Sequence, residues 1–158
     1  MNFLTEHGIS SYGELESKLT ALSARRDTAH AEIKRIESRS AELALVMKHA
    51  GTYRQLKPLY ERYRKSNDKE KFLRGHESEI ILFEAAAREL KKMGAVPLPS
   101  TEGMKTELAA LAGKKDNLLA EYCAARSQAQ EYETIRKNVD ALLSVPKEQE
   151  QQRRHELE

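Results

Sequence analysis

The residues with the clearest chemical potential lie in one basic stretch, residues 48–74. It holds nine Lys and Arg against three Asp and Glu, a surplus of six positive charges in a chain whose net charge is +2. Three tyrosines and a phenylalanine are interleaved with these cations. Cations that track phosphates, together with rings that stack on bases, are the combination that single-stranded nucleic acid prefers. The candidate nucleic-acid contacts are Arg54, Lys57, Tyr60, Arg62, Tyr63, Arg64, Lys65 and Lys69.

Two other interpretations of this basic stretch stay open. Tyr53, Tyr60 and Tyr63 are three to seven positions apart, so their rings could pack with only their hydroxyls in water. The expected packing partners are Ile80, Ile81 and Phe83. The cations would then form an ordinary solvated face. Alternatively, the cations could face a protein partner with an acidic surface.

The other reactive residue types show no arrangement typical of a catalytic or metal site. The five histidines are scattered without metal-ligand spacing, and the single cysteine has no second cysteine to form a CxxC pair. No glycine-rich loop precedes a helix, and no serine or cysteine lies in a nucleophile elbow. We therefore expect no cofactor, no metal site and no catalytic residue. Cys123 is expected to be a small buried thiol or an incidental helix residue.

Two long segments that must position the basic stretch share an apolar spacing of four then three residues. Such a spacing keeps a narrow stripe on one helix face, which paired helices bury against each other. The fold class is therefore predicted as all-α: a long antiparallel coiled-coil helical hairpin with a small helical head at one end. The first stripe is Leu15, Leu19, Leu22, Ala29, Ile33, Ile36, Leu43, Met47 and Ala50. The second is Met104, Leu108, Leu111, Leu118, Tyr122, Ala125, Ala129, Tyr132, Val139 and Leu143.

Capping and breaking residues set the first boundaries. Ser11, followed three residues later by a glutamate, has the form of a capping box and predicts the first long helix over about 12–50. Gly51 and Pro58 predict a bend or a short restart, because proline inside a helix removes a hydrogen bond and clashes with the preceding turn. The helical head then covers about 51–99.

Within this head, residues 66–68 (Ser-Asn-Asp) predict a stop and a new cap. A short helix over 69–74 and a stronger one over 77–93 follow, and Gly94 is suited to end the second. A Ser-Thr pair can cap the last long helix, predicted over about 101–144. Residues 1–145 are thus interpreted as one helical domain.

The last segment, residues 146–158, is charged and lacks an apolar period, so it is expected to be a disordered tail. Its final Leu157 and Glu158 are expected to derive from a cloning vector. No stretch approaches the ~20 apolar residues that span a bilayer, and the start of the chain lacks the pattern of a secretion signal. We therefore expect no membrane insertion and a cytoplasmic location.

Three phrases carry a resemblance to a known family. The first consists of Leu4, Glu6, His7, Gly8, Ile9, Tyr12, Glu14 and Leu15. The second consists of Lys71, Phe72, Leu73, His76, Glu77, Ile80, Leu82, Phe83, Ala85 and Ala86, and the third of Leu98, Pro99 and Ser100. With these phrases, residues 2–145 resemble the C-terminal region of relaxase/mobilisation nuclease proteins from conjugative and mobilisable elements of Firmicutes type.

This resemblance implies a parent enzyme that nicks DNA at a transfer origin. Enzymes of that family use a nucleophilic tyrosine and a metal held by a histidine cluster in an N-terminal domain, and neither motif matches this chain. No catalytic residue can therefore be assigned by the resemblance. For C-terminal regions it implies auxiliary roles: contacts with DNA, oligomerisation, or engagement of the coupling protein and secretion channel.

The sequence thus leads to one main hypothesis and one alternative. The main hypothesis is a non-catalytic accessory domain of a DNA relaxase that contacts single-stranded DNA through the basic head. The alternative is a coiled-coil spacer or docking module that joins the relaxase to other transfer proteins. Homo-oligomerisation through a partly open coiled-coil seam is a further expectation.

Overall fold

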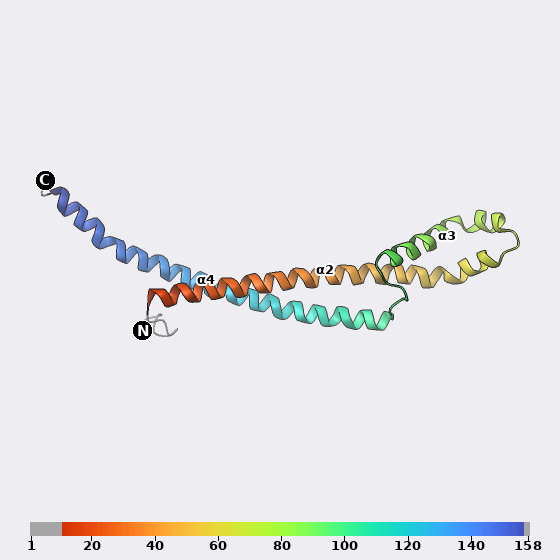
Figure 1. Cartoon of the computed structure of the whole chain (residues 1–158), viewed down its shortest axis with the longest axis horizontal. Coiled ribbons are helices and arrows are strands. Elements are labelled where there is room, and N and C mark those ends of the chain that lie inside the picture. The colour runs from red at the N-terminus through yellow and green to blue at the C-terminus, as the bar shows by residue number, and fades with distance from the viewer. Residues whose placement is uncertain (1–10, 157–158) are drawn as a thin grey trace. The chain divides into compact units, whose positions relative to one another are not determined.

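The computed structural model describes residues 11–156, apart from the side chains of 144–150 and 155. Three helices account for this range: α2 (Tyr12–Lys65), α3 (Lys69–Lys92) and α4 (Thr101–Glu156) (Figure 1). Residues 11–156 contain no strand, so the all-α fold class is confirmed. No helix in the described part of the chain is long and apolar enough to cross a membrane. The family phrase that begins at Leu4 lies largely outside the described residues.

The chain divides into two compact units, each with its own core. The first combines the N-terminal part of α2, up to Lys34, with α4 from Asp116 onward. The second is the continuous segment Arg35–Lys115, which holds the rest of α2, all of α3 and the start of α4.

In the first unit, two helices pack side by side in opposite directions. Residue pairs along them run in opposite order: the Tyr12 hydroxyl donates to Asp140 at 3.1 Å, and Arg25 pairs with Glu121 at 3.5 Å. Partial loss of solvation, and after it the hydrogen bond to the Asp140 carboxylate, raise the pKa of Tyr12. The core of this unit consists of Leu15, Leu19, Leu22, Ala125 and Tyr132.

In the second unit, α3 joins α2 and α4 around a shared core. Its buried residues come from all three helices: Leu43, Val46 and Ala50 from α2, Leu90 from α3 and Met104 from α4. Burying apolar area contributes roughly 25 cal/mol per Å², so this three-helix core is the main source of stability in the unit.

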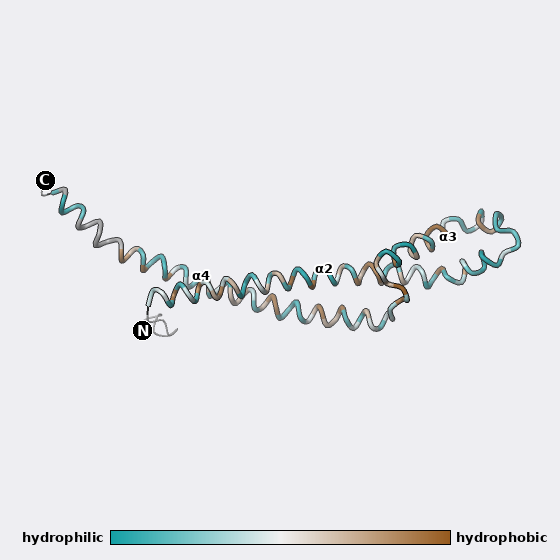
Figure 2. The backbone as a smooth tube through the Cα atoms, viewed as in Figure 1, coloured by the Kyte–Doolittle hydropathy of each residue, from teal (hydrophilic) through white to brown (hydrophobic). Residues whose placement is uncertain are grey.

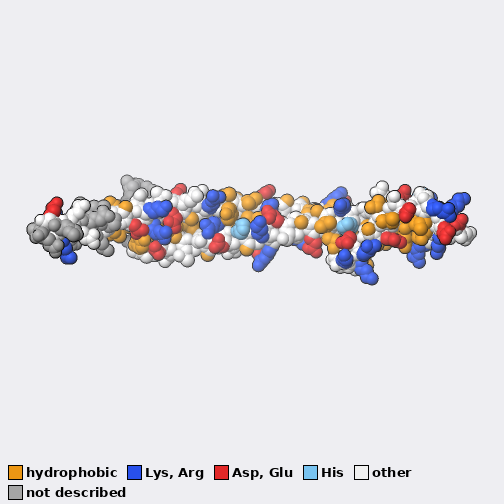
Figure 3. Space-filling model, turned by 90° about the horizontal axis from the view of Figure 1, so that it is seen from above, with side chains coloured by type: hydrophobic (Ala, Val, Ile, Leu, Met, Phe, Trp, Pro, Cys, Tyr) orange, Lys and Arg blue, Asp and Glu red, His pale blue; other side chains and the backbone are white. Residues whose placement is uncertain are grey.

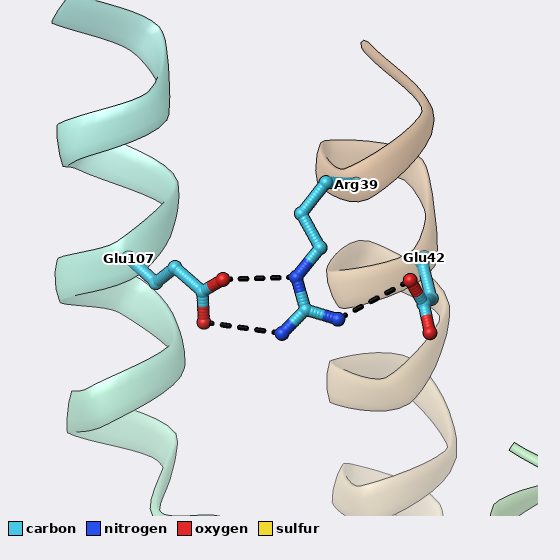
Figure 4. Close-up of polar contacts among 3 residues, drawn as sticks. All are labelled: Arg39, Glu42 and Glu107. Atoms are coloured by element: carbon cyan, nitrogen blue, oxygen red, sulfur yellow. Dashed lines mark hydrogen bonds and ion pairs between the residues drawn. The ribbon is translucent and has the colours of Figure 1, made fainter. Parts of the chain in front are cut away.

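Arg39 links α2 to α4 in the second unit. Its guanidinium donates to both carboxylate oxygens of Glu107, at 2.9 and 3.4 Å, and to Glu42 at 3.2 Å (Figure 4). Hydrogen bonds to these two carboxylates raise the pKa of Arg39. Glu37 and Lys115 form a second pair between the same helices at 3.2 Å. A fork bonded to both oxygens fixes direction as well as distance, which sets the register of α2 against α4.

The predicted apolar stripes are largely confirmed. On α2 every member is buried except Met47, which is half-buried while its neighbour Val46 is buried. On α4 only Met104, Ala125 and Tyr132 are buried. Most of the others are half-buried, because one partner helix covers only a narrow strip of α4. Leu143 was predicted within the stripe but is 63% exposed, so that assignment is wrong.

Of the bend or short restart predicted between Gly51 and Leu59, the restart is absent, because α2 continues as one helix through Pro58 to Lys65. A proline inside a helix costs about 3 kcal/mol. Aromatic packing on both sides of the proline offsets that cost. Tyr53, one turn before Pro58, and Tyr60, just after it, both stack on Phe83 of α3, with ring centroids 4.8 and 4.3 Å apart. Phe83 therefore contacts α2 on both sides of Pro58.

The predicted helix starts are confirmed by hydrogen bonds. The hydroxyl of Ser11 accepts from the Glu14 N–H at 3.2 Å, and that of Ser100 accepts from the Gly103 N–H at 2.9 Å. At the start of α3, the Asp68 carboxylate accepts from a backbone N–H at 3.1 Å. Each cap satisfies an otherwise unpaired N–H in the first turn, worth about 1 kcal/mol.

The end of α3 is also as predicted. Gly94 adopts a φ of 70°, a conformation that favours glycine. The Gly94 N–H donates to the Lys91 carbonyl at 3.2 Å, and the Ala95 N–H donates to the Leu90 carbonyl at 2.9 Å. This pair of bonds is the Schellman motif. It turns the chain sharply out of the helix and into the connection to α4.

Two predicted boundaries differ in detail. The expected break near Gly75 is a local kink at His76 (φ −136°, ψ 24°) within one helix, α3. The tail expected to be disordered from residue 146 is helical as far as Glu156. Its Glu, Gln and Arg residues have high helix propensity, so α4 continues although its apolar period has ended. Leu157 and Glu158 lie outside the described residues.

The Arg39 fork gives a stability prediction. Arg39→Glu should lower the free energy of unfolding by about 1 kcal/mol, because it replaces an attraction to Glu107 with repulsion in a half-exposed site. Adding Glu107→Arg should recover most of that loss. Urea unfolding followed by circular dichroism measures both variants. Lys114→Glu, at an exposed position in the same unit, is the control for net charge. Strictly additive effects of the two changes would contradict a direct interaction.

Candidate nucleic-acid interface

Four exposed cations gather where α2 ends and α3 begins. Arg62, Arg64 and Lys65 lie in the last turn of α2, and Lys69 opens α3. We name these four residues the tip cluster. Successive helix positions are rotated by about 100°, so Arg62 and Lys65 share one face at the end of α2, while Arg64 points away from it. Figure 3 shows Lys and Arg side chains crowded around this turn.

The tip cluster is electrostatically unsatisfied. Within residues 11–156, none of its four side chains forms an ion pair with a carboxylate. Some cations elsewhere on the helices do form ion pairs. Arg136, for example, contacts Glu16 at 3.6 Å and Glu133 at 2.9 Å. Cations without a carboxylate partner in the protein stay available to attract an anionic ligand.

The tyrosines of the basic stretch are used in packing. Tyr53 and Tyr60 stack on Phe83, Tyr63 lies 5.9 Å from Tyr60, and Phe72 lies 6.1 Å from Tyr63, measured between ring centroids. All three tyrosines are half-buried. The packing interpretation is therefore confirmed for these rings. They form an internal row of aromatic contacts between α2 and α3.

The expected packing against Ile80, Ile81 and Phe83 holds only in part. Ile80 and Phe83 are buried, whereas Ile81 is 56% exposed, as is its neighbour Leu82 at 55%. Helical geometry explains the difference, because residues one apart point in directions about 100° from each other. This part of α3 thus buries one apolar side and exposes another to solvent.

Arg54 and Lys57 lie earlier on α2 and have different surroundings. The Arg54 guanidinium donates to the Pro99 carbonyl at 2.7 Å and to the hydroxyl of Thr101. It thus ties α2 to the start of α4. The Lys57 ammonium lies 6.0 Å from the centre of the Tyr53 ring, within reach of a cation–π interaction. The eight residues predicted as nucleic-acid contacts therefore fall into separate groups. Among them, Arg54 stabilises the contact between α2 and the start of α4.

A groove between α2 and α3 brings in residues that the sequence did not single out. It has a volume of about 470 Å³ and places Arg88 of α3 with Arg64 and Lys57 of α2. Glu61 and Glu84 line the same groove, so its charge is mixed. Arg88 lies fourteen positions past the end of the basic stretch. Only the antiparallel pairing of the two helices, which sequence composition does not reveal, brings it close.

No group of three or more His, Cys, Asp or Glu residues among the described side chains could hold a metal ion. Cys123 is exposed on α4, so of its two expected settings the buried thiol is wrong. The arrangement offers binding surfaces: the tip cluster and grooves between helices.

The fold and these surfaces define an all-α protein built from long paired helices. No protein-family model, no curated protein and no solved structure matches this chain. The resemblance to the C-terminal region of relaxases stays a prediction.

The aromatic row yields a second stability prediction. Phe83→Ala should lower the free energy of unfolding by about 3–5 kcal/mol, since it removes a buried ring and the support of two tyrosines across Pro58. Tyr60→Phe should change it by less than about 1 kcal/mol, because the contact uses the ring and not the hydroxyl. Thermal unfolding of both variants is the measurement. A loss below about 1 kcal/mol for Phe83→Ala would mean that the continuity of α2 through Pro58 does not depend on Phe83.

Proposed function

We propose that this chain is a non-catalytic accessory domain of a DNA relaxase, which holds single-stranded DNA through the tip cluster during conjugative transfer. The observation that carries the DNA contact is the group of four exposed cations without counterions at one helix-to-helix turn. Single-stranded DNA offers phosphates at a spacing that such a group can track. The association with a relaxase rests on the resemblance of the three sequence phrases.

The position of Lys69 and Lys71 supports a binding role for this turn. Both lie in the first turn of α3, where the helix dipole favours acidic residues and disfavours cations by about 0.3–1 kcal/mol each. Placing cations there does not help α3 to fold. A bound anion would offset the unfavourable interaction of these two lysines with the helix dipole.

The tyrosines take an indirect part in this proposal. Because Tyr53 and Tyr60 are stacked on Phe83, they position the end of α2 instead of offering free faces to bases. Tyr63, in contact with Phe72, connects the two helices next to the tip cluster. Binding through phosphates predicts little dependence on base sequence and a strong dependence on salt.

The alternative function is a spacer or docking module for the transfer machinery. The observation in its favour is the length of the helices: α2 has 54 residues and α4 has 56. Such helices present far more surface than a four-residue cluster requires. A spacer predicts no affinity for DNA at any salt concentration, so the two functions separate in one titration. Homo-oligomerisation through the half-covered stripe of α4 also stays a prediction, and light scattering at several concentrations measures it.

The DNA proposal predicts salt-dependent binding of a labelled single-stranded oligonucleotide, measured by fluorescence anisotropy. Four phosphate contacts imply that the affinity falls about 50-fold between 50 and 200 mM salt. The triple variant Arg62→Glu, Arg64→Glu, Lys65→Glu should weaken binding at least about tenfold and flatten the salt dependence, because three contacts become repulsive.

The matched control reverses three exposed cations elsewhere: Lys114→Glu, Arg126→Glu and Lys137→Glu. It changes the net charge by the same amount and leaves the tip cluster intact. Binding should persist in this variant. Equal losses in both triple variants would show that overall charge, and not the tip cluster, attracts DNA, while no binding by the parent chain at 50 mM salt would favour the spacer.

A further inference from the structure

A second, larger pocket lies at the other end of α3 from the tip cluster. Its volume is about 700 Å³, within the range of pockets that take a small molecule or an anchoring side chain. It is bounded by α2, by the last turns of α3 and by the connection that leads to α4. The lining residues are Tyr53, Lys57, Ala87, Leu90, Lys91, Gly94, Val96, Pro97 and Leu98. Figure 2 shows hydrophobic residues concentrated along this connection.

The walls of this pocket are held by interactions already described. The Schellman motif at Gly94 fixes the direction in which the connection leaves α3. Arg54 holds the far end of the connection by its bond to the Pro99 carbonyl. Tyr53 and Leu98 also pack against the core of the second unit. A pocket with fixed walls loses little conformational freedom when a ligand enters.

The lining combines an aliphatic floor with two positive charges. Lys57 lines the pocket from α2 and Lys91 from α3, so the two cations come from different helices. Neither forms an ion pair with a carboxylate in the described part of the chain. Val96 is 66% exposed, an unusual state for a β-branched apolar residue at the edge of a pocket. Apolar surface beside unpaired cations suits a ligand that is apolar at its centre and anionic beside it.

The same lining disfavours a nucleobase. The only aromatic side chain is Tyr53, whose ring already stacks on Phe83 and lies below the Lys57 ammonium. No free aromatic face is left on which a base could stack, so the pocket lacks the stacking contact that accompanies phosphate contacts in single-strand recognition. The aliphatic side chains of Ala87, Leu90 and Leu98 instead suit an apolar side chain of a protein partner.

We propose that this pocket docks a segment of a partner protein in which an apolar side chain is flanked by carboxylates. The apolar side chain occupies the floor formed by Ala87, Leu90 and Leu98, and the carboxylates pair with Lys57 and Lys91. This site shares no residue with the tip cluster and does not rest on DNA binding. It gives the chain two surfaces, one for phosphates and one for an acidic, apolar peptide.

The test is a titration of the full chain, labelled at its methyl groups, with three short capped peptides observed by nuclear magnetic resonance. Their central sequences are Glu-Leu-Leu-Glu, Lys-Leu-Leu-Lys and Glu-Ser-Ser-Glu. The acidic leucine peptide should shift the methyl signals of Ala87, Val96 and Leu98 in a saturable way. The other two should bind at least about tenfold more weakly, because each lacks one half of the complementarity.

A charge reversal makes the assignment specific. Lys57→Glu with Lys91→Glu should weaken the acidic leucine peptide about tenfold or more and improve the basic one. The matched control, Lys114→Glu with Lys137→Glu, should leave both affinities unchanged. Both pairs of positions are exposed, so circular dichroism should show the same helicity in all variants at the temperature of the titration.

Three outcomes would overturn the proposal. The first is the absence of any shift at the pocket methyl groups at millimolar peptide. The second is equal binding of acidic and basic leucine peptides, which would mean nonspecific hydrophobic contact. The third is displacement of the acidic peptide from the pocket by a single-stranded oligonucleotide in the variant that lacks the three tip-cluster cations, which would assign the pocket to nucleic acid.

Discussion

A helix as long as α2 does not persist in water through backbone hydrogen bonds alone, because most helical stability in proteins comes from burying an apolar face. The buried stripe on α2 is therefore the constraint on which the other elements depend. In the first unit it packs against Ala125 and Tyr132, and in the second it packs against Leu90 and Met104. The polar pairs, such as Arg39 with Glu107, fix the register of the two helices, while the apolar residues make their contact favourable.

The candidate binding surfaces follow from how the stripe ends. Beyond Ala50, α2 packs on α3 mainly through aromatic rings, which need one face of the helix and leave the remaining directions to charged residues. The tip cluster and the larger pocket are thus products of the same packing. One lies where the helix pair turns, and the other where α3 ends and the chain leaves for α4.

Patterns that act locally were readable in the sequence. The apolar stripe, the caps at Ser11, Asp68 and Ser100, and the glycine that ends α3 depend on neighbours a few residues away, and all were predicted. Properties that depend on distant residues were missed. The contacts of Tyr53 and Tyr60 on either side of Pro58 are made with Phe83 of α3, and the grooves gain cations, Arg88 and Lys91, from that same helix.

The order of the two units along the chain has a consequence for how the protein acquires its structure. The second unit is one continuous segment, whereas the first joins residues as distant as Tyr12 and Asp140, 128 positions apart. Closing so long a loop is entropically costly in an unfolded chain. Once the second unit has formed, most of the chain inside that loop is already compact, which lowers the entropic cost of bringing the two ends of the loop together. Folding should therefore begin in the middle of the chain and proceed outward to both ends.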